Sequence, residues 1–457
     1  MEKDYVYLNS TQSLCPVCLK KIDAKLVIKN GKVFMKKNCR DHGEFTCLIE
    51  DDAEYFLSQS YYKKPGTISK TRMNIKDGCP FDCGLCPDHE QHSCINLINV
   101  TDNCELGCTT CYISSDKSGK YLSLAKIDEM LDFIVDSEYG KAEIIQISGG
   151  EPATHPDILK ILELTKTKNI KFMMLNTNGI RIGEDEKFAE QLAAFKGGFE
   201  VYLQFDGLKE ETYRKLRGKD LLEIKKRAIK NLHKYGIPVT LVSVIEKGTN
   251  DDEIGDLIRF GLETNFIRGI NFQPVSYFGR IERINPEERS TVTSVIYDIE
   301  NQTRGLIKKS DIIPLPCDPD KISLTYLIKN KNKFVPITRK IDVRKHLSVI
   351  NNSLSFVPAD FLDNSLKGLW SLPGFFSSFR SLKDFSCCIP YDPALLSKKE
   401  RMKFVDNNTF RISIVSFQDA YNFDVKSVKS ECIHFITPDL KKIPFSTFNI
   451  FNKGRTK

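Results

Sequence analysis

The stretch CINLINVTDNCELGCTTC, residues 94–111, decides the fold, because a short apolar run leads directly into three closely spaced cysteines. The spacing C-x3-C-x2-C places Cys104, Cys108 and Cys111 on one loop. Three thiolates on such a loop can hold three irons of a [4Fe–4S] cube and leave the fourth iron open. An open iron can chelate S-adenosylmethionine (SAM), so these cysteines are predicted to be catalytic as well as metal ligands. The alternative, a structural zinc knuckle, needs a fourth ligand close by.

Short apolar runs alternate with amphipathic helical stretches from about residue 95 to residue 275. Strands that are each followed by a helix predict an α/β fold with a parallel sheet built from βαβ units. Closed in part, such a sheet is a partial (β/α)6 barrel, with its active site at the C-terminal ends of the strands. The runs are CINLINV (94–100), AEIIQIS (142–148), IKFMMLN (170–176), EVYLQFD (200–206), PVTLVSVI (238–245) and IRGINFQP (267–274).

Polar side chains and glycines follow several of these runs, at the barrel rim where a ligand would lie. A glycine pair lets the backbone approach a ligand, and Glu151 can accept hydrogen bonds from an ammonium group. Gln273 and Ser276, after the last run, are candidate substrate contacts. The alternative is that these residues only form turns and helix caps. The predicted SAM-binding residues are Gly149, Gly150, Glu151, Asn176, Asn178, Gln204 and Asp206.

A second cysteine-rich segment, DGCPFDCGLCPDHEQHSC at 77–94, precedes the barrel. Cys79, Cys83, Cys86 and Cys94 supply four thiolates, which is a full set for an auxiliary [4Fe–4S] cluster. Zinc stays an alternative, because Zn²⁺ also takes four thiolates. His89 and His92 in this segment could be ligands, but four cysteines suffice, so both are expected to be solvated loop residues.

The N-terminal region contains two knuckles separated by a predicted hairpin in VIKNGKVF. Cys15 and Cys18 form the first, and Cys39 and His42 form the second. This layout is typical of a rubredoxin-like or zinc-ribbon site, with closed tetrahedral coordination. Cys47 is an alternative to His42 as the fourth ligand. The ligand types fit one mononuclear Zn or Fe and do not choose between them.

The chain as a whole reads as four parts. These are a rubredoxin- or zinc-ribbon-like module (1–70), an auxiliary cluster segment (71–98), the barrel (99–315) and a C-terminal α+β cap (316–457). Fifteen cysteines without an apolar signal segment indicate metal binding rather than disulfides. A net charge of +7 without basic clusters argues against a nucleic-acid partner. We expect a cytoplasmic protein, with peripheral contact at the inner membrane face as an option for a lipid substrate.

With these motifs in view, the sequence resembles the radical SAM family that includes the archaeal tetraether lipid synthase, some of whose members are labelled pterin methylases. The resemblance implies a 5′-deoxyadenosyl radical that abstracts hydrogen from an unactivated carbon. The first interpretation is carbon–carbon coupling of lipid alkyl chains, and the alternative is radical methylation of a pterin-like heterocycle. An electron donor such as ferredoxin or flavodoxin is the expected partner. A non-enzyme alternative is an iron–sulfur electron carrier. The shared stretches are SLCPVC, DGCPFDCGLCPDH, CELGCTTC, ISGGEP, LNTNG, LQFDG, FQPVSYFGR, PLPC (314–317) and FRISIVSFQDAYNFDV (410–425).

The sequence departs from this family near its C-terminal end. Glu431 and Ser446 stand where members tend to carry cysteine, and no further cysteine closely follows Cys317. The departures predict two [4Fe–4S] clusters, about eight irons, and one mononuclear metal per chain. The Phe-rich stretch at 368–379 is a candidate wall for a lipid groove. The cysteines expected to stay free are Cys317, Cys387, Cys388 and Cys432.

Overall fold

The computed structural model describes residues 4–84, 86–264, 266–330, 333–339, 343 and 408–451. The Phe-rich stretch 368–379, together with Cys387 and Cys388, lies outside the described residues. No helix among the described residues is long and apolar enough to cross a membrane.

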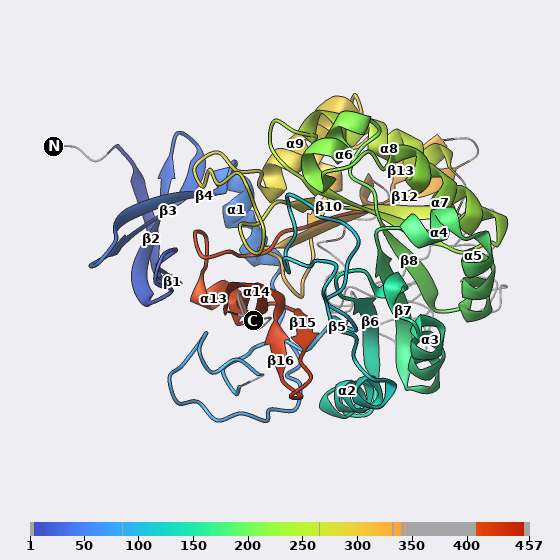
Figure 1. Ribbon diagram of the computed structural model, residues 1–457. Helices are drawn as coiled ribbons and strands as arrows, with labels where there is room; N and C mark the ends of the chain where they lie inside the picture. Colours follow the sequence, from blue (N-terminus) through green and yellow to red (C-terminus); the bar gives the residue numbers. More distant parts are fainter. Residues whose placement is uncertain are drawn as a thin grey trace, which may run out of the picture.

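A parallel sheet forms the centre of the molecule (Figure 1). Its strands neighbour one another in chain order, and every adjacent pair is parallel. Each strand matches one of the predicted apolar runs, so the predicted partial (β/α)6 barrel is confirmed. The strands are β5 (Ile95–Asn99), β6 (Ala142–Ser148), β7 (Ile170–Thr177), β8 (Phe199–Gln204), β9 (Val239–Ile245) and β10 (Ile267–Pro274).

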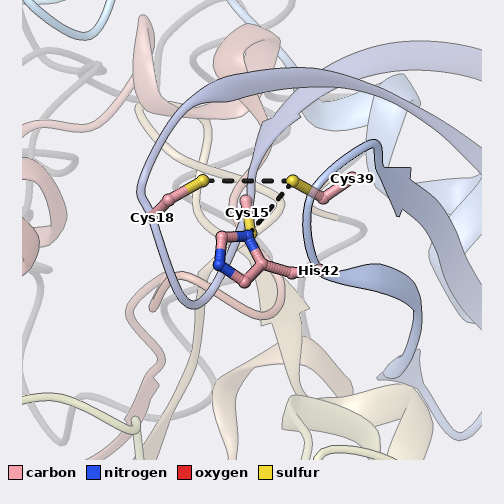
Figure 2. Close-up of side chains that lie close together, drawn as sticks. All are labelled: Cys15, Cys18, Cys39 and His42. Atoms are coloured by element: carbon pink, nitrogen blue, oxygen red, sulfur yellow. Dashed lines mark hydrogen bonds between the residues drawn. The ribbon is translucent and has the colours of Figure 1, made fainter.

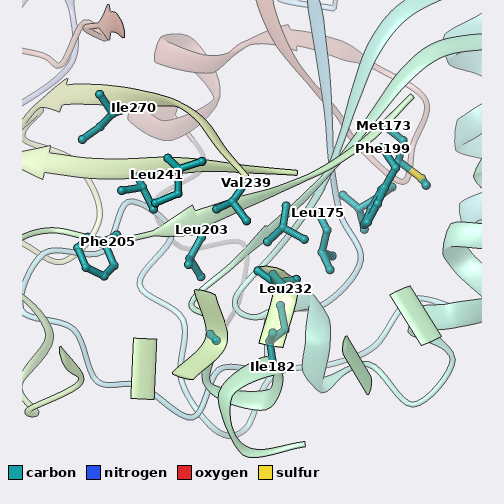
Figure 3. Packing of buried hydrophobic residues seen from close by; sticks show 14 of the residues in the cluster. Met173, Leu175, Ile182, Phe199, Leu203, Phe205, Leu232, Val239, Leu241 and Ile270 are labelled. Atoms are coloured by element: carbon teal, nitrogen blue, oxygen red, sulfur yellow. The ribbon is translucent and has the colours of Figure 1, made fainter. Parts of the chain in front are cut away.

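Helices cover the outer face of this sheet. Figure 3 shows Leu203 and Leu241 from the strands packed with Ile182 and Leu232 from the helices, and all four side chains are fully buried. Burying one such side chain contributes about 1.5–3 kcal/mol. Because side chains alternate along a strand, the other half of the strand residues point into the barrel. The helices are α2 (Leu124–Ser137), α3 (Ile158–Thr167), α4 (Ile180–Glu184), α5 (Glu186–Leu192), α6 (Glu210–Arg217), α7 (Leu222–Lys234), α8 (Ile254–Glu263) and α9 (Val292–Gln302).

The C-terminal part continues the barrel sheet at both of its edges. Strand β14 (Thr409–Val415) pairs in parallel with β10, and β15 (Ile433–Ile436) pairs in parallel with β5. An open edge would leave a row of backbone groups unpaired, and these strands satisfy them. The expected cap is therefore built into the sheet, and the boundary after residue 315 stays a prediction. Further elements are β11 (Ile313–Pro314), β12 (Ile322–Asn330), β13 (Lys333–Pro336), β16 (Lys442–Pro444), α13 (Val425–Val428) and α14 (Phe445–Phe451).

The N-terminal module is a four-stranded antiparallel sheet in chain order. The predicted hairpin is confirmed, since β2 and β3 are joined by Asn30 and Gly31, both with positive φ as a type I′ turn requires. The buried carboxylate of Glu50 accepts from the Thr293 backbone amide at 2.9 Å, which fixes the module to the barrel. The elements are β1 (Val6–Leu14), β2 (Lys21–Lys29), β3 (Lys32–Cys39), β4 (Gly43–Glu50) and α1 (Ala53–Gln59).

Candidate functional site

The three cysteines that follow β5 line a cavity at the C-terminal ends of the barrel strands. Cys104 and Cys108 are buried, and Cys111 is half-buried. Backbone hydrogen bonds hold the loop at both ends, from Cys104 N to Asp116 O at 2.8 Å and from Cys111 N to Arg280 O at 2.9 Å. The cavity contains about 1040 Å³ of space not filled by protein atoms, part of it open to solvent.

The glycine pair after β6 packs directly on the segment that precedes Cys104. A Cβ on Gly149 would lie 2.3 Å from Thr101 O, and one on Gly150 would lie 2.3 Å from Asn103 O. Gly150 N also donates to Thr101 O at 2.8 Å. The pair therefore admits the backbone contact that sets the cysteine loop against the β6 turn.

Glu151, next in the chain, is buried at the cavity wall. Its carboxylate accepts from Asn178 N and Thr177 Oγ1, each at 2.6 Å, and from Ala153 N at 2.9 Å. Burial and the nearby Glu105 raise the pKa of Glu151 to about 7. The carboxylate thus fixes the β7 turn and also faces the space where a ligand ammonium would lie.

Most of the predicted SAM-binding residues line the same cavity as the cysteines. Asn176 donates from Nδ2 to Ser148 Oγ at 3.0 Å, and Asn178 donates from Nδ2 to Glu105 Oε1 at 3.0 Å. These bonds fix the orientation of both amides. The predicted residues found here are Gly149, Gly150, Glu151, Asn176, Asn178 and Gln204, together with Gln273 and Ser276.

Asp206 differs from this prediction. Its side chain is fully buried and is outside the set of described residues that line the cavity. The carboxylate is occupied by Arg217, whose Nε and Nη2 donate to it at 2.8 and 2.6 Å. Arg217 lines the cavity instead, and its Nη1 donates to Thr110 O at 3.1 Å, inside the cysteine loop. Asp206 therefore positions an arginine that lines the cavity, while its own side chain lies behind the lining.

Lys225, which the sequence analysis missed, supports the same wall from behind. It is fully buried, and its Nζ donates to Asn178 O at 2.8 Å and to Gln204 O at 2.6 Å. Burial lowers the pKa of Lys225 to about 8. The ammonium joins the ends of β7 and β8, so two cavity residues are held by one buried donor.

The four cysteines predicted to hold the auxiliary cluster are divided between two places. Cys79, Cys83 and Cys86 line one small pocket. Cys94 instead lies with Cys317 and Cys432, their Sγ atoms all within 4.8 Å of one another. The reason is strand pairing, because β15 lies beside β5 and Cys94 N donates to Cys432 O at 2.8 Å.

The two histidines between these cysteines are not the solvated residues that we expected. His89 is buried, and its Nε2 lies 3.0 Å from both Glu431 O and His434 Nε2. Burial lowers the pKa of His89 to about 4. His92 is half-buried, with Nε2 3.7 Å from Cys94 Sγ. Both histidines are therefore part of the structure around the two cysteine groups.

The N-terminal knuckles come together as one group (Figure 2). The Sγ atoms of Cys15, Cys18 and Cys39 and the His42 nitrogen lie within 4.8 Å of one another. Four such ligands suit a tetrahedral mononuclear ion. Cys47, the alternative ligand, is buried elsewhere beside Arg289, and burial raises the pKa of its thiol to about 11.

Comparison with known proteins matches the barrel and the N-terminal module to two different families of domains. Residues 98–261 match the Radical SAM superfamily, and residues 7–51 match the HMPTM N-terminal zinc ribbon domain. The 7,8-dihydro-6-hydroxymethylpterin dimethyltransferase of Methanocaldococcus jannaschii is 35% identical over 97% of this chain and 94% of its own length. The chain belongs to the radical SAM family.

Two further proteins are similar to part of the chain. The GTP 3′,8-cyclase of Aquifex aeolicus is 28% identical over 52% of this chain and 71% of its own. The crystal structure of Streptococcus suis SuiB bound to S-adenosylmethionine is 17% identical, covers 48% of this chain and 49% of its own, and has a TM-score of 0.37. Radical SAM membership implies a [4Fe–4S] cluster and SAM, and the three-thiolate loop in its cavity fits that group. The further cysteine groups and the zinc ribbon fit an auxiliary cluster and Zn²⁺.

Iron content tests the auxiliary group. We expect Cys83→Ser to lower the iron of the anaerobically reconstituted protein by about four atoms per chain, because a thiolate ligand is lost. Cys47→Ser is the matched control, since Cys47 is equally a thiol but lies outside the cysteine groups. Unchanged iron in Cys83→Ser would contradict the assignment. About twelve cluster irons in the unchanged protein would contradict the predicted eight and place a third cluster at Cys94, Cys317 and Cys432.

Proposed function

We propose that this protein is a radical SAM methyltransferase whose substrate is a pterin-like heterocycle. The observation that carries the proposal is the similarity to the pterin dimethyltransferase, which extends over 97% of the chain at 35% identity. That similarity includes the region that matches the HMPTM zinc ribbon as well as the barrel. From the sequence alone the lipid chain was the first interpretation and the pterin the alternative, and this similarity favours the pterin.

Amide side chains inside the barrel support the same choice. A second cavity, with about 880 Å³ not filled by protein atoms, shares Tyr112, Asn176 and Gln273 with the cavity at the cysteines. Amide side chains in such a place suit a ligand with hydrogen-bonding edges. A lipid chain would instead need an apolar groove, because leaving it in water costs about 0.8 kcal/mol per CH₂. Peripheral membrane contact has no support among the described residues.

The proposed roles follow from the cavity wall. A [4Fe–4S] cluster held by Cys104, Cys108 and Cys111 supplies, when bound, the electron that cleaves SAM. Glu151 accepts from the ammonium group of SAM, and Asn176, Asn178 and Gln204 contribute fixed amides around it. Phe417 and Phe445, which also line the cavity, exclude water from the space where hydrogen is abstracted. The electron comes from a reductant, for which a ferredoxin or flavodoxin is the proposed donor.

Anaerobic turnover tests the proposal. The reconstituted protein is incubated with dithionite, methyl-labelled SAM and 7,8-dihydro-6-hydroxymethylpterin, and the products are read by mass spectrometry. We expect the pterin to gain one or two labelled methyl groups while 5′-deoxyadenosine accumulates. An unchanged pterin beside a modified component of the host lipid extract would overturn the proposal in favour of the lipid substrate.

A further inference from the structure

The inner face of the barrel has two chemically different walls. The cavity-lining residues on β8 and β10 are amides and a phenol, and β7 adds Asn176 beside Met174, whereas those on β5, β12 and β15 are aliphatic. Both walls line the second cavity, which lies further inside the barrel than the cysteines. The polar residues are Asn176, Tyr202, Asn271 and Gln273, and the aliphatic residues are Leu97, Leu324 and Ile433.

An aromatic group, consisting of Tyr112, Phe417 and Phe445, lies where the two cavities meet, because all three residues line both. The rings of Phe417 and Phe445 are stacked with their centroids 3.9 Å apart and their planes at 25°. The Tyr112 ring lies 5.5 Å from that of Phe445. Tyr112 directly follows Cys111 in the chain, so one end of this aromatic group is fixed beside the cysteine loop.

Asn271 on the polar wall has an unused donor. The side chain is 1% exposed, and its Oδ1 accepts from Ser413 Oγ at 2.8 Å. Its Nδ2 makes no hydrogen bond of full geometry among the described residues, although the Tyr202 phenol lies within interaction distance of the Asn271 side chain. A buried amide without a partner is costly, so a ligand that offers an acceptor at this point would be favoured.

The floor of the same cavity carries a second donor group. Arg411 lines it, and its Nη2 donates to Thr240 Oγ1 at 3.1 Å while lying 3.9 Å from Glu200 Oε1. The carboxylate partly balances the guanidinium charge. Arg411 also hydrogen-bonds Tyr326. The Asn271 amide and the guanidinium donors that these contacts leave can meet the carbonyl oxygen and an unprotonated ring nitrogen of a fused pyrimidinone.

We propose that this second cavity is the substrate pocket and that the Asn271 amide donates a hydrogen bond to the pyrimidinone edge of the heterocycle. The inference rests on the function proposed above. The ring is inserted edge-first toward Asn271 and Arg411, with its face on the aliphatic wall. The opposite end of the ring, which carries the reacting carbon, then points past the aromatic group toward the cavity at the cysteines, where SAM is proposed to bind.

Binding measurements on paired variants test the pocket. Asn271→Leu keeps the side-chain volume and removes the donor. Asn96→Leu is the matched control, because Asn96 is also fully buried and has an unpartnered amide oxygen. Asn96 lies between Ile95 and Leu97, which line the cavity, so its own side chain points to the other face of the strand. Both variants are prepared as reconstituted holoenzyme with SAM, and their iron content and urea midpoint are compared with wild type. Affinity for 7,8-dihydro-6-hydroxymethylpterin is then measured by calorimetry.

We expect Asn271→Leu to raise the Kd about 10- to 100-fold, the effect of removing a buried hydrogen bond to the ligand, and Asn96→Leu to leave it unchanged. If wild type binds and methylates the pterin but Asn271→Leu binds it equally well, the pocket assignment is overturned and the proposed function stands. If wild-type holoenzyme does not bind the pterin at all, the proposed function and the inference both fall. An equal loss in both variants would also overturn the specific role of Asn271.

Discussion

Replacing Cys104, Cys108 and Cys111 together by Ala is expected to abolish the conversion of SAM to 5′-deoxyadenosine and methionine. Among the described residues, no thiolate would remain in the cavity to hold the cluster. The measurement is anaerobic incubation with dithionite and SAM, with 5′-deoxyadenosine quantified by chromatography and mass spectrometry. The loss of SAM cleavage should be complete, because these three cysteines supply the thiolates of the described residues that line the cavity.

The control for this variant must separate a lost cluster from a lost fold. Cys47→Ala removes a buried thiol that does not line the cavity and should leave SAM cleavage unchanged. Iron content and the far-UV spectrum of the triple variant should show a folded chain that lacks about four irons. Wild-type rates of SAM cleavage by the triple variant would refute the assignment of the active site.

The barrel could be predicted from the sequence because the patterns that specify it lie within short stretches of the chain. Each strand is a short apolar run, each helix has an amphipathic period, and consecutive strands pair in chain order. The same locality placed Gly149, Glu151 and Asn176 at the rim, since residues that end parallel strands meet at one edge of the sheet. The cysteine loop follows β5 by only a few residues, so its position was fixed by the same strand.

Contacts between distant parts of the chain could not be predicted. The pairing of Ile95 with Ile433 moves Cys94 away from Cys83 and beside Cys432. No local pattern in the cysteine spacing carries that information, and four thiolates close in sequence suggested one site. The C-terminal strands join the sheet for the same reason, because only the folded barrel shows which edges are open.

The need of Arg217 for a buried partner of opposite charge could have been predicted from the sequence. Helix α6 buries Tyr213, Leu216 and Arg217, which share one face at helical spacing. A charged residue on an apolar helical face needs a buried partner of opposite charge. The partner is the carboxylate at the end of β8, which explains why Asp206 is not free to bind a ligand.

Removing Arg217 is expected to weaken both the fold and the active site. Arg217→Met leaves the fully buried Asp206 carboxylate without its cation, which costs about 3–5 kcal/mol of unfolding free energy. Replacing both partners, as Asp206→Leu with Arg217→Met, should recover most of that stability, because a buried ion pair is often matched by apolar residues of similar size. Anaerobic urea denaturation measures both variants.

The double variant separates the effect of Arg217 on the stability of the fold from its effect on the position of the cysteine loop. It still lacks the bond from Arg217 Nη1 to Thr110 O, which lies between Cys108 and Cys111. We therefore expect its SAM cleavage to stay on the order of 100-fold below wild type, the size of effect that small misplacement of reacting groups causes. Arg214→Gln on the same helix is the control, since its exposed pair with Glu210 contributes only about 0.5 kcal/mol and lies outside the cavity. Wild-type SAM cleavage by the stable double variant would show that Arg217 supports the fold alone and does not position the cysteine loop.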